Sequence, residues 1–148
     1  KTMDPNNIFI LFDDENTSKT VESTGELGNK LKEFKDSPII KIGMFTKLIV
    51  NHFTFHTKLE KFLKEEEPSY NVESTREASE FVVFNRAFHY LNQINPLDKE
   101  VIFAILDFDD EILGKTLESA ITYFETLEEY EKCAHIFKFQ KILRESKR

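Results

Sequence analysis

Two histidines one helical turn apart are the side chains of this sequence best suited to chemistry. His52 and His56 lie within a predicted helix, and Glu60 follows one turn later, so the three side chains share one side of that helix. Two imidazoles and a carboxylate at this spacing are typical ligands of zinc and related metals. With His89 as a further ligand from elsewhere in the chain, the set predicts a metal-dependent hydrolase or a metal sensor as one alternative.

The same two histidines also fit a role in a hydrophobic core. They fall within an apolar stripe of the helix that includes Phe45, Ile49 and Leu59. Phe53, not a glutamate, follows His52, so the signature of zinc-dependent proteases is absent. The sequence also contains no Gly-rich phosphate loop, no Gly-x-Ser-x-Gly turn and no Cys-x-x-Cys pair. We therefore expect a protein without catalytic activity or a cofactor, in which the histidines are core residues.

The clearest pattern for tertiary structure lies in the last third of the chain. Apolar residues recur there at helical spacing on both sides of an acidic break at Glu128 and Glu129. This pattern predicts an antiparallel helical hairpin, with helices over residues 110–126 and 129–146. Because no Gly or Pro interrupts the break, one straight helix over 110–146 is the alternative.

The stretch from Leu117 to Leu143 resembles one tetratricopeptide unit. The resemblance rests on the segment LEEYEKCAHIF and on spaced apolar residues, namely Leu117, Ala120, Ile121, Phe124, Leu127, Tyr130, Cys133 and Phe137. Helical hairpins of some repair proteins and protease adaptors have a similar core. The resemblance covers this hairpin alone, since no second copy occurs at a period of about 34 residues. It implies a docking scaffold for proteins, for which Tyr130, Phe137 and Phe139 are the candidate contact residues.

The middle of the chain predicts four further helices. Capping and proline signals place them over about residues 23–35, 38–66, 75–94 and 97–106, and the second begins either at Pro38 or only after Gly43. The starting signals are capping boxes at Ser23–Glu26 and Ser74–Glu77, Ser37 before Pro38, and Asn95 before Pro96. The helix over 75–94 is apolar on several sides, so we expect it at the centre of the fold, covered by neighbours.

Residues 8–12, with the sequence IFILF, form a continuous apolar run between polar residues. Their β-branched and aromatic side chains predict a short strand or an extended segment, with residues 39–42 as the one candidate partner strand. Five large apolar side chains in a row are too many for a solvent-exposed tail. We expect the segment to be covered on both sides by the fold, by a partner or by a second copy of the chain. It supplies four candidate contact residues: Ile8, Phe9, Leu11 and Phe12.

Length and composition predict one compact, mainly α domain. The 148 residues are 40% hydrophobic and 32% charged, which is the balance of a folded globular protein. With 15 Phe and only four Gly, the composition favours helices packed by large aromatic side chains. We expect five or six helices in a single domain over residues 1–148, divided into an extended N-terminal arm and loop (1–22), a helical core (23–106) and the C-terminal hairpin (107–148).

Charge and cysteine content restrict the partners and the compartment. The net charge of −7 disfavours binding to nucleic acids and to anionic membranes. Basic residues at the C-terminal end leave a nucleic-acid-associated factor as a further alternative; they are Lys138, Lys141, Arg144, Lys147 and Arg148. The single cysteine, Cys133, excludes an intrachain disulfide, and no run approaches about 18 apolar residues. We therefore expect a cytoplasmic protein that is not inserted in a membrane.

The overall pattern favours a regulatory or interaction protein over an enzyme. A helical scaffold with a hairpin, an acidic surface and no catalytic motif is typical of a protein that binds other proteins. Scarce Ala and Gly, with frequent Lys, Ile, Asn and Phe, are typical of AT-rich genomes, including those of many phages. We expect an accessory or phage-encoded factor that binds a larger host protein.

Overall fold

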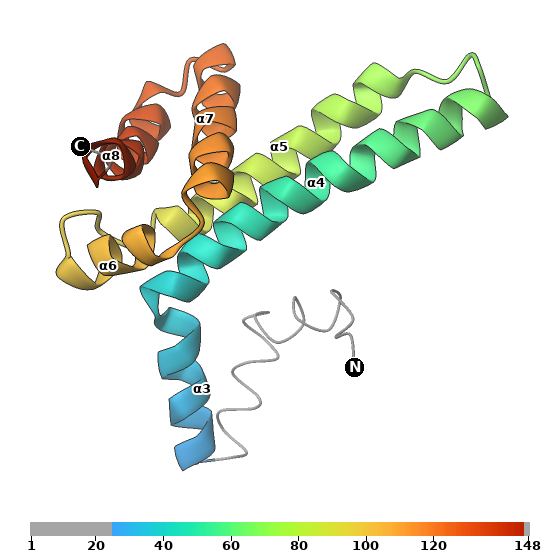
Figure 1. Cartoon of the computed structure of the whole chain (residues 1–148). Helices are drawn as coiled ribbons and strands as arrows, with labels where there is room; N and C mark the ends of the chain where they lie inside the picture. Colours follow the sequence, from blue (N-terminus) through green and yellow to red (C-terminus); the bar gives the residue numbers. More distant parts are fainter. Residues whose placement is uncertain (1–24, 147–148) are drawn as a thin grey trace.

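The computed structural model describes residues 25–146, and this part of the chain is helical and contains no strand (Figure 1). Its six helices, in chain order, are α3 (Glu26–Asp36), α4 (Pro38–Glu66), α5 (Val72–Leu91), α6 (Lys99–Asp107), α7 (Asp110–Thr126) and α8 (Tyr130–Ser146). The predicted mainly α fold is confirmed. Within the residues described, none of these helices combines the length and the apolar character needed to cross a membrane.

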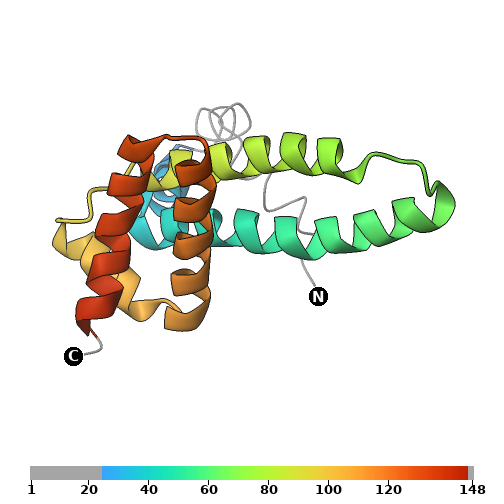
Figure 2. The same ribbon diagram turned by 90° about the horizontal axis from the view of Figure 1, so that it is seen from above.

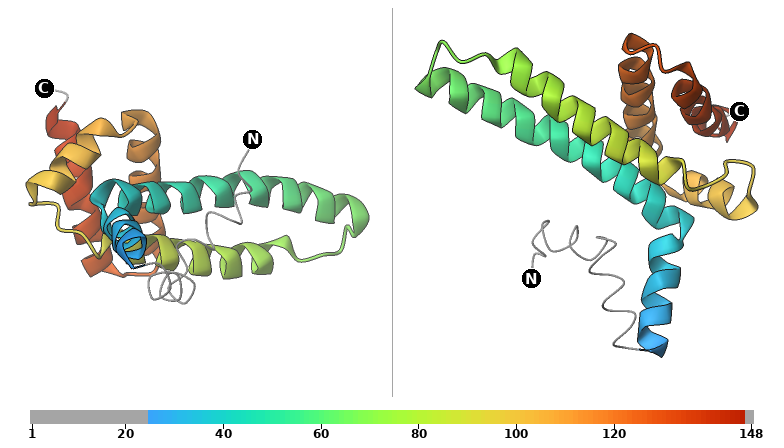
Figure 3. Two further views of the ribbon diagram at one scale, coloured as in Figure 1. Left: turned by 90° about the horizontal axis from the view of Figure 1, so that it is seen from below. Right: turned by 180° about the vertical axis from the view of Figure 1, so that it is seen from behind.

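The longest feature is the antiparallel pair of α4 and α5, which lie side by side along most of their length (Figure 2). The short helix α6 connects this pair to α7 and α8, which form a second hairpin across one end of the pair. Seen from the side, α7 and α8 lie on one face of the α4–α5 pair, and α3 projects from the opposite face (Figures 1 and 3). The pair therefore separates two sides of the molecule.

The hydrophobic core lies at one end of the α4–α5 pair, where α6, α7 and α8 cover it. Its most deeply buried large side chains are Ile42, Phe45, Ile49, Leu91, Ile105, Leu113, Leu117, Phe124, Ile136 and Phe139. On α4 the core cluster ends at Ile49, and on α5 it begins at Phe84. The remaining parts of the two helices, residues 50–66 and 72–83, extend beyond the core and are called the arm below (Figure 2).

The turn between α7 and α8 explains why one straight helix does not form. Glu128 has a φ of 59°, in the left-handed region. The amides of Glu128 and Glu129 donate to the carbonyl oxygens of Glu125 and Phe124, over 3.0 and 2.9 Å. Hydrogen bonds of this kind close a helix end and let the chain reverse. The predicted hairpin is confirmed, and the alternative of one helix over 110–146 is wrong.

Two helices begin with caps other than the predicted ones. Asn71, rather than Ser74, caps α5, because its side chain accepts a hydrogen bond from the Ser74 amide over 3.4 Å. The helix therefore starts earlier than the capping box at Ser74 suggested. Gly25, rather than Ser23, is the N-cap of α3, and no side chain caps that helix start.

Two local segments also differ from expectation. The side chain of Asn95 accepts a hydrogen bond from the amide of Leu97 over 3.0 Å, and this local turn delays α6 until Lys99. Residues 39–42, expected as a partner strand, form the first turns of α4, which begins at its proline and continues through its glycine. A proline in the first helical turn fixes φ at a helical value, which explains the helix. Residues 8–12 lie outside the described part of the chain.

We expect Glu128→Gly to raise the free energy of unfolding by about 1 kcal/mol, because glycine adopts the left-handed conformation without the strain that a Cβ introduces. Urea denaturation followed by circular dichroism measures the change. Glu118→Gly is the matched control, since Glu118 is exposed within α7 and glycine there should lower the free energy of unfolding by about 1 kcal/mol. A loss of stability at both positions would contradict the strain assigned to Glu128.

Candidate functional site

His52 and His56 lie in the seam between α4 and α5, at the base of the arm. Both side chains are buried, and their ring centroids are 5.2 Å apart with 22° between the ring planes, which is a stacked arrangement. His52 also meets the ring of Phe84 on α5 edge-on, with 6.4 Å between centroids. Nε2 of His56 approaches Oε1 of Glu60 to 2.9 Å, but without the angle of a hydrogen bond. The two histidines thus pack the two helices together.

Glu60 is held by an arginine from the neighbouring helix. Nε and Nη2 of Arg76 lie 2.8 and 2.6 Å from Oε1 of Glu60, and Nη1 of Arg76 lies 3.4 Å from Glu73 on its own helix. The hydrogen bond from Arg76 holds the pKa of Glu60 below its ordinary value of 4.5. This ion pair connects α4 to α5 where the hydrophobic core no longer does so.

The metal site predicted from the spacing of these residues is not assembled in the described part of the chain. The structure brings His52, His56 and Glu60 together, but within residues 25–146 no three His, Cys, Asp or Glu side chains are placed to hold a metal ion. His89, the fourth candidate, is exposed and contacts the ring of Tyr90, with 6.1 Å between centroids. The carboxylate of Glu60 is bound to arginine instead.

Burial determines the charge of His52. Desolvation lowers the pKa of His52 below its ordinary value of 6.5, and a positive charge on His56 would lower it further. The imidazole of His52 is therefore neutral at neutral pH. A neutral His52 ring can fill an apolar seam, whereas a proton on His52 would place a charge between the two helices.

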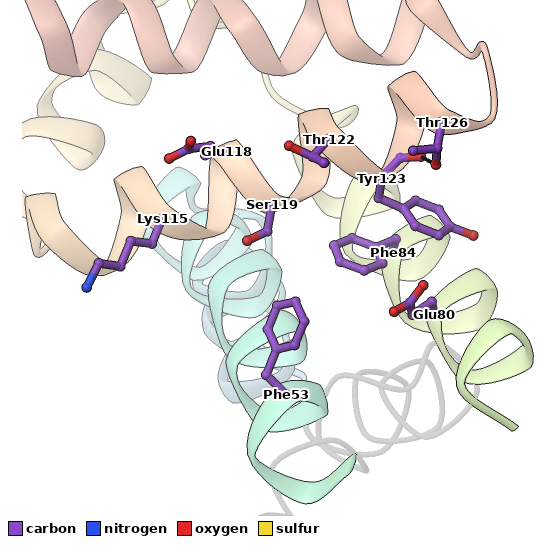
Figure 4. Close-up of a pocket in the computed structure, with 9 residues that line it drawn as sticks. All are labelled: Phe53, Glu80, Phe84, Lys115, Glu118, Ser119, Thr122, Tyr123 and Thr126. Carbon is purple, nitrogen blue, oxygen red and sulfur yellow. Dashed lines mark hydrogen bonds between the residues drawn. The ribbon is translucent and has the colours of Figure 1, made fainter. Parts of the chain in front are cut away.

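A cleft of about 560 Å³ lies on the face of the arm that is turned toward α7 (Figure 4). The rings of Phe84 and Tyr123 stack face to face with 4.4 Å between centroids, and Phe53 of α4 lies across from them. Burial raises the pKa of Glu80, whose carboxyl lies beside this stack. The other lining residues come from α7 and are mostly polar: Lys115, Glu118, Ser119, Thr122 and Thr126.

A second depression, of about 590 Å³, lies on the other face of the same two helices and is called the groove below. Phe53 lines the cleft and Phe55 lines the groove, and residues two apart on a helix point about 200° away from each other. The groove is therefore on the face from which α3 projects (Figure 3). Its lining residues are Leu48, Asn51, His52, Phe55, His56, Leu59, Ala78, Ser79, Val82 and Val83.

Large apolar side chains of the groove remain uncovered by the described chain. Phe55 is 66% exposed and Val82 is 61% exposed, and Phe62 continues the exposed row toward the tip of the arm. Contiguous exposed apolar surface of this kind marks an interaction site.

Helix α3 also carries a row of partly exposed apolar side chains. Leu27, Leu31 and Phe34 follow one another at the i, i+4, i+7 spacing of one helix face, and all three are exposed. Gly28 is the one residue of α3 that is buried.

The predicted contact residues of the C-terminal hairpin divide into two groups. Tyr130 and Phe137 are exposed on α8, and the guanidinium of Arg144 lies 5.9 Å from the ring centre of Phe137. Phe139 is 1% exposed and packs in the core against the ring of His135, so its selection as a contact residue was wrong. The N-terminal candidates lie outside the described residues; they are Ile8, Phe9, Leu11 and Phe12.

The groove residues were not selected from the sequence, although a signal for them existed. Residues 75–94 are apolar on several sides, and we expected neighbouring helices to cover all of them. In the structure α5 is buried against α4 on one side, while Phe81 and Val82 are exposed. The expectation of a central, fully buried helix was wrong because helical periodicity cannot distinguish a face covered by the chain itself from one left open.

Comparisons with known proteins assign neither a family nor a structural relative. No family model matches the sequence, no curated protein matches it, and no solved structure matches the fold.

We expect the contribution of His52 to the free energy of unfolding to fall as the pH decreases from 7.5 to 5. Well above pH 6.5 His52 is neutral in both the folded and the unfolded state. As the pH falls through 6.5, the unfolded chain takes up the proton first, because burial lowers the pKa of His52 in the folded state. The loss of stability ends once the pH is below that folded pKa. Urea denaturation at several pH values measures this slope. His52→Gln removes the titrating group and should flatten the profile, so parallel profiles for the two proteins would contradict the assignment.

Proposed function

We propose that this protein is a non-catalytic interaction protein that binds an amphipathic helix of a partner protein in the groove between α4 and α5. The observation that carries the proposal is the exposed apolar lining of this groove, with Phe55 and Val82 more than half exposed. In this role the chain is an accessory factor to a larger protein. It acts by binding that protein and not by catalysing a reaction.

The size and shape of the groove suit a helix. Two antiparallel helices leave a furrow between them into which a third helix packs by its apolar side chains. From Leu48 to Leu59 the groove rises about 16 Å along α4, which is about three helical turns of a bound segment. A partner with apolar residues at i, i+3 or i+4 and i+7 would place one anchor in each turn.

Burial of the exposed side chains supplies the driving force. Covering a large apolar side chain contributes about 1.5–3 kcal/mol, so Phe55 and Val82 together account for a substantial part of a micromolar affinity. The rim is polar, since Asn51 and Ser79 also line the groove. An apolar centre with a polar rim is the usual composition of a protein interface.

The floor of the groove is fixed before any partner arrives. The stacked rings of His52 and His56 fill the seam, and the pair of Glu60 with Arg76 joins the two helices above it. A site that does not need to be ordered upon binding retains more of its contact energy as affinity. Substitution of Arg76 would therefore weaken binding without removing any contact with the partner.

We expect Phe55→Asp and Val82→Asp to abolish capture of the partner while leaving the fold intact, because a carboxylate in the groove cannot be desolvated against an apolar helix. Affinity purification of tagged full-length protein from cells, with quantitative mass spectrometry, compares each variant with wild type. Phe103→Asp is the matched control, since Phe103 is 69% exposed on α6, outside the groove.

The decisive result is a protein retained by wild type and by the Phe103→Asp control but lost, at least about tenfold, with both groove variants. Circular dichroism melts of all variants verify that the core is unaffected, because none of the three substituted side chains belongs to it. If every captured protein were retained by the groove variants, the groove would not be the binding site and the proposal would be wrong.

A further inference from the structure

Positive charge lies along both edges of the groove, although the chain as a whole has a net charge of −7. Lys47, Asn51 and Lys58 are spaced at i, i+4 and i+11, which places them within about 40° of one another around α4. Asn51 lines the groove, so both lysines lie along its edge on α4. On α5, Arg86 follows the groove residue Val82 by one helical turn. The three basic side chains are exposed and are called the rim cations below.

Acidic residues are absent from the same stretches of the two helices, except on the opposite face. Over residues 38–59, α4 contains no Asp or Glu, and Glu60, the first one, is held by Arg76 in the seam. Over residues 79–91, the one acidic residue of α5 is Glu80, which lines the cleft. The groove side of the arm is therefore positive in a protein that is acidic overall.

The rim cations are available for a partner. The ion pairs formed among residues 25–146 all involve other side chains. Covering the groove would remove water from the cations at its edges, and carboxylates on the occupant would offset that loss. A basic occupant would be repelled at the same positions. The groove therefore favours an occupant that is acidic on both sides of its apolar surface.

We infer that the partner segment is an acidic amphipathic helix, whose apolar stripe lies against Phe55 and Val82 and whose flanking carboxylates pair with the rim cations. This inference rests on the proposed function, because it names the class of partner for the same groove. A helix with apolar residues at i, i+4 and i+7 carries i+1 and i+8 along one edge of that stripe, and i+3 and i+10 along the other. Asp or Glu at these edge positions distinguishes the partner segment from other amphipathic helices.

Two synthetic peptides test the inference on the full-length protein. Both are Ala-rich helices of about 18 residues with Leu at i, i+4 and i+7, and they carry either Glu or Lys at the edge positions. Fluorescence anisotropy measures the Kd of each peptide at low ionic strength and at about 0.5 M salt. Because the net charge of the protein is −7, non-specific attraction would favour the Lys peptide. A preference for the Glu peptide therefore reports the charges at the groove.

We expect the Glu peptide to bind about tenfold more tightly than the Lys peptide, because each exposed ion pair contributes a factor of about 1.5 to 5. High salt should reduce this difference to less than about twofold, because it screens exposed charges. Lys58→Glu combined with Arg86→Glu should reverse the preference. Lys99→Glu combined with Lys138→Glu is the matched control, since it changes the net charge equally at exposed positions outside the groove and should leave the preference for the Glu peptide intact.

Several results would overturn the inference. They are equal affinities of the two peptides, including no binding by either, and a preference that the control pair of substitutions removes as fully as the groove pair does. An affinity for the Glu peptide that Phe55→Asp leaves unchanged would place the peptide outside the groove. A dimer seen by sedimentation velocity and dissociated by Phe55→Asp would assign the groove to a second copy of the chain.

The two proposals fail in different experiments. If groove substitutions do not affect capture of any partner from cells, the proposed function is wrong, and the inference is wrong with it. If capture depends on the groove but the two peptides bind equally, the groove binds a partner and only the acidic character assigned to that partner is wrong.

Discussion

Two helices packed side by side can bury only one side of each, and the arm is subject to this constraint along its whole length. In the seam itself the chain uses side chains that tolerate burial as a pair, the stacked imidazoles of His52 and His56. Toward the tip of the arm, an ion pair between Glu60 and Arg76 joins the two helices. On the outer sides of the arm, residues 25–146 provide no third helix, so these residues leave apolar side chains such as Phe55 and Val82 uncovered.

At the other end of α4 and α5, further helices of the same chain cover the outer sides of the pair. Helices α6, α7 and α8 cover the pair and produce the one hydrophobic core of the described residues. Phe84 lies at the boundary between the arm and the hydrophobic core. Its ring contacts His52 in the arm, stacks on Tyr123 and meets Phe124 edge-on. Rigid aromatic contacts of this kind make the orientation of the arm depend on the packing of the core.

Sequence patterns were sufficient for the parts of the fold that depend on local chemistry. The C-terminal hairpin was predicted nearly to the residue, because Asp109 caps α7 through the amide of Ile112 and apolar spacing defines both helices. The long helix that ends at residue 66 was also predicted, with its start left open between Pro38 and the residue after Gly43, and the structure has the earlier start. Local signals misplaced a helix start where two polar residues could each act as the N-cap, as with Asn71 and Ser74 at the start of α5.

The candidate site was harder to predict because its exposure depends on which other helices pack against it. The spacing of His52, His56 and Glu60 was interpreted correctly as one helix face, but the partner of Glu60 is Arg76, which is distant in sequence and carries no recognisable motif. Phe139 and Phe137 are two positions apart and point to opposite sides, so only the packing of α8 on its neighbours decides which one is exposed. Exposure is a property of the assembled helices, and periodicity alone does not report it.

If the groove binds a partner as proposed, the position of α7 and α8 on the other side of the α4–α5 pair would leave room for a second bound molecule. The exposed rings of Tyr130 and Phe137 belong to the hairpin on one side of the α4–α5 pair, while the groove opens on the other side. A ligand bound on one side would leave the other side accessible, so two ligands could be bound at once on opposite sides of the pair. Two molecules bound in this way would have a high effective concentration relative to each other, because only the thickness of two helices would separate them.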